Sequence, residues 1–182
     1  LMLTQVGDLY GTLPTEIGTM SNLKHLYLAS SSLTGPIPSE IGSLSSLWLI
    51  SLPDNDLTGS FPGQLGLPSL EYLYMGRNNL TGSLPSEIRL MSSLYFLDFY
   101  GNNLTETIPS EIGLLTHLEG LSLYGNNLNG TIPSEIGLLT SLAILSLWDN
   151  NLNGTIPSEI GLLTGLTQFH VDDNSLTGTI PS

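Results

Sequence analysis

A unit of 24 residues that occurs twice in succession constrains the fold more than any other feature of the chain. Residues 118–141 read LEGLSLYGNNLNGTIPSEIGLLTS, and residues 142–165 read LAILSLWDNNLNGTIPSEIGLLTG. A fixed period of this length is typical of solenoid proteins. One unit cannot bury its own apolar face, so neighbouring units have to stack on one another.

The same pattern extends over the sequence of 182 residues, which we therefore interpret as a single array, 1–182, without a second domain. The expected units are a partial unit 1–22, the repeats 23–46, 47–69, 70–93, 94–117, 118–141 and 142–165, and a partial unit 166–182. Because the sequence starts and stops inside a unit, we expect it to be a segment of a longer parent chain or assembly.

The unit, written L-x-x-L-x-L-x-x-N-x-L-x-G-x-I-P-x-E-I-G-x-L-x-x, resembles the plant-specific subclass of leucine-rich repeats. The resemblance covers nearly the whole chain. It implies an α/β solenoid, a right-handed superhelix with a concave parallel β-sheet, short helical or 3-10 return segments and a second short sheet. Plant-type arrays usually carry disulfide-bonded caps, and this sequence departs from them because it contains no cysteine.

One asparagine recurs in each unit directly after the strand. A primary amide offers two donor hydrogens and one acceptor, so an asparagine buried there can bond backbone groups of its own loop and of the next coil. The alternative is a functional row that faces solvent. The column contains Asn55, Asn78, Asn102, Asn126, Asn150 and Asn174, with Ser31 in the first place.

Three units depart from the pattern. In repeat 70–93, Arg89 stands where glycine is usual. Glu106 stands where the other units have a turn glycine, which takes positive φ at low cost, so we expect a strained or differently shaped turn there. Repeat 47–69 is one residue short and has an additional proline, Pro68, which cannot donate a helical hydrogen bond. We expect a bend or a shortened helical turn in that unit.

The charge balance excludes some partners. The formal net charge is −13, from 16 acidic residues against Lys24, Arg77 and Arg89. Nucleic acids and anionic membranes attract clustered cations, so neither is an expected partner. No apolar run approaches the about 20 residues of a membrane span and no signal peptide is visible, so we expect no membrane insertion by this segment. The I-P-S-E-I-G glutamates form an acidic row, either a solvated outer face or a cation-binding strip.

Solenoids bind ligands through the variable residues of the concave strands, and aromatic residues are frequent in these columns. We expect a diagonal stripe that binds a ligand, although packing between neighbouring strands would also explain the aromatics. Asp98, Asp149 and Asp172 lie beside the stripe, and His170 belongs to the same columns. The aromatic members of the stripe are Tyr72, Tyr74, Phe96, Tyr100, Tyr124 and Trp148.

Catalysis and metal binding have little support in the sequence. A catalytic Ser-His-Asp triad could be drawn from Ser146, His170 and Asp172. Neighbouring columns of a sheet bring such residues together by chance. Asp54-Asn55-Asp56 and Asp172-Asp173-Asn174 match only fragments of a calcium loop. We therefore expect no catalytic residues, no metal site and no cofactor.

Four N-x-S/T sequons follow the asparagine column, although the repeat itself generates this motif. In a secreted eukaryotic protein some of them would carry glycans on one flank. Their asparagines are Asn79, Asn103, Asn129 and Asn153.

The function expected from these features is recognition of a protein, peptide or glycan on the concave sheet, outside the cell or at its surface. The plant-type leucine-rich-repeat family, which the sequence resembles, includes receptor ectodomains and inhibitors of polygalacturonases. The alternative is a structural protein, ice-binding or of the matrix, which would use a regular row of small polar residues. That row is Thr34, Thr58, Thr81, Thr105, Asn129, Asn153 and Thr177.

Overall fold

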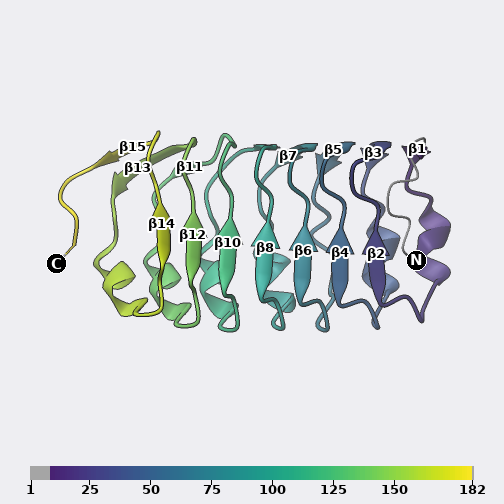
Figure 1. Ribbon diagram of the computed structural model, residues 1–182, viewed down its shortest axis with the longest axis horizontal. Coiled ribbons are helices and arrows are strands. Elements are labelled where there is room, and N and C mark those ends of the chain that lie inside the picture. Colours follow the sequence, from purple (N-terminus) through teal and green to yellow (C-terminus); the bar gives the residue numbers. More distant parts are fainter. Residues whose placement is uncertain (1–8, 182) are drawn as a thin grey trace.

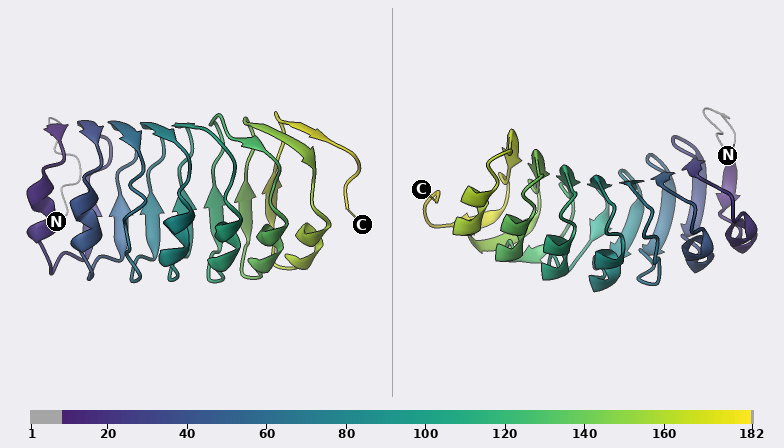
Figure 2. Two further views of the ribbon diagram at one scale, coloured as in Figure 1. Left: turned by 180° about the vertical axis from the view of Figure 1, so that it is seen from behind. Right: turned by 90° about the horizontal axis from the view of Figure 1, so that it is seen from below.

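The structure is a computed structural model that describes residues 9–181. The start of the partial unit 1–22 and the last residue of the unit 166–182 lie outside the described residues. The right-hand view of Figure 2 shows coils stacked into a gently curved array, with the helical turns on the outer side and the two ends of the array far apart. The expected leucine-rich-repeat solenoid is confirmed.

A seven-stranded parallel sheet forms the concave side, with one short strand from each coil (Figure 1). The strands pair in register, so that Leu97 lies between Leu73 and Leu121. These leucines point inward and are fully buried, as the alternation of apolar residues predicts. The strands are β2 (His25–Tyr27), β4 (Leu49–Ser51), β6 (Tyr72–Tyr74), β8 (Phe96–Asp98), β10 (Gly120–Ser122), β12 (Ile144–Ser146) and β14 (Gln168–His170).

Two smaller parallel sheets run along one flank, at the top of Figure 1, and correspond to the second sheet that the resemblance implies. The five-stranded sheet contains β1 (Tyr10–Thr12), β3 (Ser32–Pro36), β5 (Asp56–Ser60), β7 (Asn79–Gly82) and β9 (Asn103–Leu104). The three-stranded sheet contains β11 (Asn129–Gly130), β13 (Asn151–Thr155) and β15 (Ser175–Thr177).

The flank sheet is divided at the turn that contains Glu106. This residue adopts φ 66°, a conformation that favours glycine, and β9 has only two residues. The coils remain joined there by a hydrogen bond of 2.9 Å from the Asn129 N–H to the Glu106 carbonyl. The expectation of an unusual turn at Glu106 is confirmed.

The return segments are single 3-10 turns on the convex side. Each follows a proline in extended conformation, whose carbonyl accepts the first hydrogen bond of the turn. Repeat 47–69 has no such helix between its strands and the next unit, which confirms the expected irregularity. The 3-10 helices are η1 (Thr15–Thr19), η2 (Ser39–Ser43), η3 (Ser86–Leu90), η4 (Ser110–Leu114), η5 (Ser134–Leu138) and η6 (Ser158–Leu162).

Buried asparagines connect the coils behind the concave sheet. Asn126 donates from Nδ2 to the carbonyls of Phe99 and Leu123, both at 3.0 Å, and Oδ1 accepts the Leu104 N–H at 3.0 Å. Phe99 and Leu104 belong to the preceding coil. The sequence predicted bonds to the next coil, and this prediction is wrong, because the side-chain amide bonds the coil before it. Asn55, Asn78, Asn102 and Asn150 repeat this arrangement, which we call the asparagine ladder.

Candidate binding surface on the concave sheet

The outward-facing positions of the concave strands flank the leucines that anchor the sheet. In β6 and β8, Leu73 and Leu97 are buried, whereas Tyr72, Tyr74 and Asp98 are half-buried. The core is complete without these outward side chains. Their contacts with one another therefore determine what the concave surface presents.

The first aromatic group surrounds Tyr72. Its ring stacks with Phe96 at 5.9 Å between centroids and with Tyr74 at 6.2 Å. The ring of Phe96 extends over Gly120, where an added Cβ would lie 2.5 Å from it. A glycine at this place in β10 allows the phenylalanine to lie flat on the sheet.

The first group also contains rings that sequence reasoning did not select. The ring centroid of Trp48 lies 4.4 Å from that of His25 and 5.9 Å from that of Tyr72. The ring centroid of Tyr95 lies 6.2 Å from that of Tyr72. Trp48 and Tyr95 precede their strands by one residue. A search of the columns extended by one position towards the N-terminus would have found them.

The second group, which we call the aromatic stack, consists of Tyr100, Tyr124 and Trp148. Each residue follows its strand by two positions. The rings of Tyr100 and Tyr124 are 4.9 Å apart, those of Tyr124 and Trp148 are 4.6 Å apart, and both pairs are nearly parallel. All three side chains remain half-buried, so the edges of the rings contribute to the surface.

The expected diagonal stripe is thus two groups. Within residues 9–181, no ring contact joins the Tyr72 group to the aromatic stack. The interruption lies at Asp98, which pairs in register with Tyr74 on one side and with Ser122 on the other. A carboxyl group between two aromatic groups gives this surface a polar centre.

Electrostatics connect Asp98 to the tyrosines on both sides. Burial raises the pKa of the Asp98 carboxyl, while hydrogen bonds from the Tyr100 N–H and the Ser122 hydroxyl act in the opposite direction. Burial, assisted by the charge of Asp98, also raises the pKa of the hydroxyls of Tyr74, Tyr100 and Tyr124. These hydroxyls therefore stay protonated at neutral pH and can both donate and accept hydrogen bonds.

The remaining concave candidates lie towards the C-terminal end. Asp149, His170 and Asp172 are exposed. A hollow of about 340 Å³ is lined by Trp148, His170, Asp172 and Asp173. The structure thus brings His170 and Asp172 next to the aromatic stack and leaves them far from Tyr72.

The residues of the possible triad do not form a relay. Ser146 is buried on β12 and pairs in register with His170, which is exposed on β14. No hydrogen bond among the described residues joins the side chains of Ser146, His170 and Asp172. In the same part of the chain, no group of three or more His, Cys, Asp or Glu side chains is arranged to hold a metal ion.

The four sequon asparagines are exposed on the flank sheets. Asn79 and Asn103 begin β7 and β9, and Asn129 and Asn153 lie in β11 and β13. Asn129 and Asn153 are also members of the threonine and asparagine row. Possible glycan positions and the row of small polar residues therefore share one flank.

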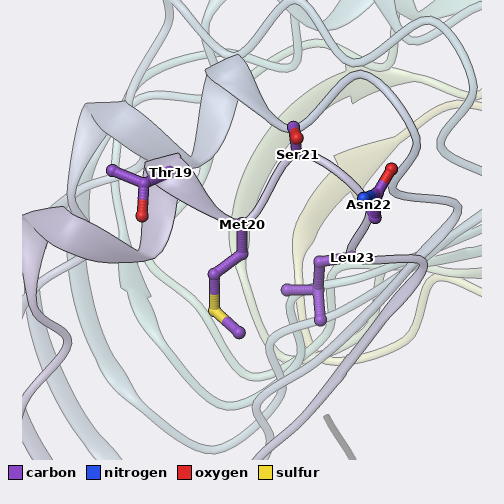
Figure 3. A pocket seen from close by; sticks show the side chains of 5 residues that line it. All are labelled: Thr19, Met20, Ser21, Asn22 and Leu23. Carbon is purple, nitrogen blue, oxygen red and sulfur yellow. The ribbon is translucent and has the colours of Figure 1, made fainter.

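A further hollow, of about 380 Å³, lies at the N-terminal end of the array, where Met20 and Leu23 point to the same side of a turn (Figure 3). It is lined by one continuous stretch, 19–23, without a charged side chain. This hollow lies away from the concave aromatic groups, so we assign it no role in binding. None of the helices in residues 9–181 is long and apolar enough to cross a membrane.

Comparisons with known proteins identify the repeat. A family described as a leucine-rich repeat region matches residues 63–180, and a second, described as leucine rich repeat, matches residues 22–44. No curated protein matches the chain.

Among solved structures, the plant peptide hormone receptor RGFR1 in complex with RGF2 is 39% identical, with a TM-score of 0.93 over 94% of this chain and 28% of that one. The Arabidopsis receptor kinase HAESA, in complex with the peptide hormone IDA and the co-receptor SERK1, is 33% identical, with a TM-score of 0.92 over 94% of this chain and 29% of that one.

A plant ice-binding protein is 32% identical, with a TM-score of 0.65 over 96% of this chain and 64% of that one. The chain spans less than a third of the two receptor chains that it matches. By its repeat, its fold and these matches, the chain belongs to the leucine-rich-repeat family, and it is structurally close to plant receptor ectodomains.

Proposed function

We propose that residues 1–182 form one recognition array that binds a peptide or protein ligand on its concave sheet, without catalysis, outside the cell or at its surface. The observation that carries this proposal is the pair of half-exposed aromatic groups with Asp98 between them. Aromatic side chains provide large contact areas with little loss of conformational entropy. A glycan would use the same rings and the same hydroxyls, and it is the alternative ligand for this surface.

The relatives support a peptide ligand. Two of the matched structures are plant receptors in complex with peptide hormones, and both superimpose on this chain with TM-scores above 0.9. The net charge of −13 favours a ligand with basic groups. A further match, the LRR ectodomain of the plant membrane receptor kinase GASSHO1/SCHENGEN3, supports a location outside the cell or at its surface.

Selection from a library of displayed random peptides tests the proposal. Peptides selected on the wild-type protein should lose at least about 1 kcal/mol of binding free energy when Tyr100 or Trp148 is changed to alanine. The convex variant Glu135→Ala is the control and should bind as the wild type does. Selected peptides that bind both aromatic variants unchanged would place the ligand away from the concave sheet.

Ice binding is a second candidate, and the similarity to a plant ice-binding protein favours it. The surface for it would be the flank row, in which Thr58, Thr81, Asn129 and Asn153 are exposed. Glycans on the sequons would cover this same flank. Glycosylation and ice binding there are therefore mutually exclusive.

A thermal-hysteresis assay separates the two functions. An ice-binding protein should lose hysteresis when the bulky variant Thr58→Tyr interrupts the flank row, and it should keep hysteresis in Tyr100→Ala. A peptide-binding protein should lose peptide affinity in Tyr100→Ala and keep it in Thr58→Tyr. The protein for both assays is produced in bacteria, so that the sequons carry no glycan.

A further inference from the structure

The aromatic stack has two unlike ends. Its N-terminal end is closed, because Gly76 occupies the equivalent position in the preceding coil and an added Cβ there would lie 2.1 Å from Tyr100 Cε1. The guanidinium carbon of Arg77 lies 5.7 Å from the centre of the Tyr100 ring, and Arg77 also pairs with Asp54 at 3.5 Å. A cation held by a carboxylate therefore already caps this end.

The C-terminal end of the stack is open. Tyr124 covers one face of the Trp148 indole, and the equivalent position in the next coil is Asp172 instead of another ring. The hollow of about 340 Å³ at this end is lined by Trp148, His170, Asp172 and Asp173. An aromatic wall thus stands beside two exposed carboxylates.

Main-chain hydrogen bonds join the backbone of both aspartates to the preceding coil. The carbonyl of Asp172 accepts the Asp149 N–H and that of Asp173 accepts the Asn150 N–H, both at 3.1 Å. Neither carboxylate forms an ion pair in the described part of the chain, where the one salt bridge joins Arg77 and Asp54. The two carboxylates are exposed, and no ion pair among residues 9–181 neutralises them.

The geometry points to a subsite for a cationic side chain, an arginine of a peptide ligand, in this hollow. A planar guanidinium would stack on the free face of Trp148 and donate hydrogen bonds to the carboxylates of Asp172 and Asp173, as Arg77 does with Tyr100 and Asp54 at the other end. This assignment rests on the proposed concave binding function and specifies one residue that the ligand contains.

Two small peptides test the subsite directly. The probe is acetyl-Gly-Arg-Gly-amide, and its neutral counterpart carries citrulline, which has a similar shape without the charge. The readout is the indole N–H signal in NMR spectra, since the chain has only two tryptophans and Trp48 lies in the other aromatic group. The arginine peptide should shift the Trp148 signal in a saturable way, whereas citrulline should have little effect and the Trp48 signal should not move.

Charge-matched variants provide the control. Replacing Asp172 and Asp173 by asparagine should weaken the arginine peptide by about fivefold or more. Replacing Glu135 and Glu159 by glutamine removes the same charge from the convex side and should leave affinity within about twofold. Equal responses to arginine and citrulline, or equal losses in the two double variants, would overturn the subsite. A Trp148 shift with cellotriose but not with the arginine peptide would identify a sugar site and also overturn it.

The library selection separates this inference from the function on which it rests. Selected peptides that lose affinity in Tyr100→Ala but keep it in the Asp172→Asn, Asp173→Asn double variant would refute the arginine subsite and leave the concave function in place. Peptides that ignore every concave variant would refute both. Peptides that contain arginine and are weakened by the double variant would support both.

Discussion

At the scale of single residues, each side chain of the asparagine ladder forms hydrogen bonds with backbone groups of two coils. Each buried amide bonds carbonyls in its own loop and in the preceding coil, and it accepts one N–H from that coil. The first place of the column shows the contrast. Within residues 9–181, the hydroxyl of Ser31 donates to the carbonyl of Ala29, within its own loop.

We expect Asn126→Ala to lower the free energy of unfolding by about 1–3 kcal/mol, because the change leaves buried backbone groups without partners. Thermal or urea unfolding measures the effect. Asn129→Ala is the control, since Asn129 is exposed three residues further along the chain. Equal effects of the two substitutions would contradict the structural role of the ladder.

Asp98 should make stability depend on pH. Because its folded-state pKa is raised, the folded protein binds more protons than the unfolded chain between the ordinary and the raised value. The free energy of unfolding should therefore fall as the pH rises through that window. Asp98→Asn removes this decline, so the variant should gain stability relative to the wild type as the pH rises above the ordinary pKa of an aspartic acid.

Urea unfolding at several pH values measures this effect, with the exposed residue Asp56 as the control position in Asp56→Asn. Unfolding free energies of the wild type and Asp98→Asn that run parallel over the whole pH range would show that the carboxyl of Asp98 is not desolvated in the folded state.

At the scale of elements, the flank sheet shows what one residue does to a turn. The turns of the other units have glycine at positive φ, whereas Glu106 adopts φ 66° with a full side chain, and the five-stranded and three-stranded sheets separate there. The strain is local, because hydrogen bonds still join the neighbouring coils across this turn.

Glu106→Gly should therefore raise the free energy of unfolding by about 0.5–1 kcal/mol, since glycine takes positive φ without a steric penalty. The matched variant Glu106→Ala removes the charge but keeps the Cβ, and it should gain much less. Equal gains in the two variants would attribute the effect to charge instead of backbone conformation. Calorimetry of the three proteins gives the comparison.

At the scale of the whole molecule, burial decreases towards the C-terminal end of the array. Leu118, Leu121 and Leu123 in the middle are fully buried, whereas Leu166 and Phe169 are only partly buried. In a solenoid each coil is stabilised by its immediate neighbours, so a coil with one neighbour opens more easily.

Hydrogen exchange in a protein of this sequence should be fastest after about residue 166, next fastest before about residue 23, and slowest in the coils between residues 94 and 141. Mass spectrometry of peptic fragments measures this order. Uniform protection along the array would mean that another chain covers the ends.

The sequence by itself determined the repeat, the concave strands, the leucine core, the buried asparagines, the unusual turn at Glu106 and the irregular return of repeat 47–69. These features depend on contacts between a coil and its neighbours, and the period of the repeat reproduces those contacts in every unit. The pattern of leucines around Asn126 therefore predicts that these residues are buried, without knowledge of the rest of the chain.

Only the tertiary structure decided how the concave side chains gather. The columns place Tyr74 and Tyr100 in one stripe, but side-chain orientation assigns them to different groups with Asp98 between them. Trp48 joins the Tyr72 group from a position outside the expected columns. The open face of Trp148 depends on Asp172 of the next coil and on Tyr124 of the previous one. Such contacts arise from the packing of variable residues across coils, which the repeat does not specify.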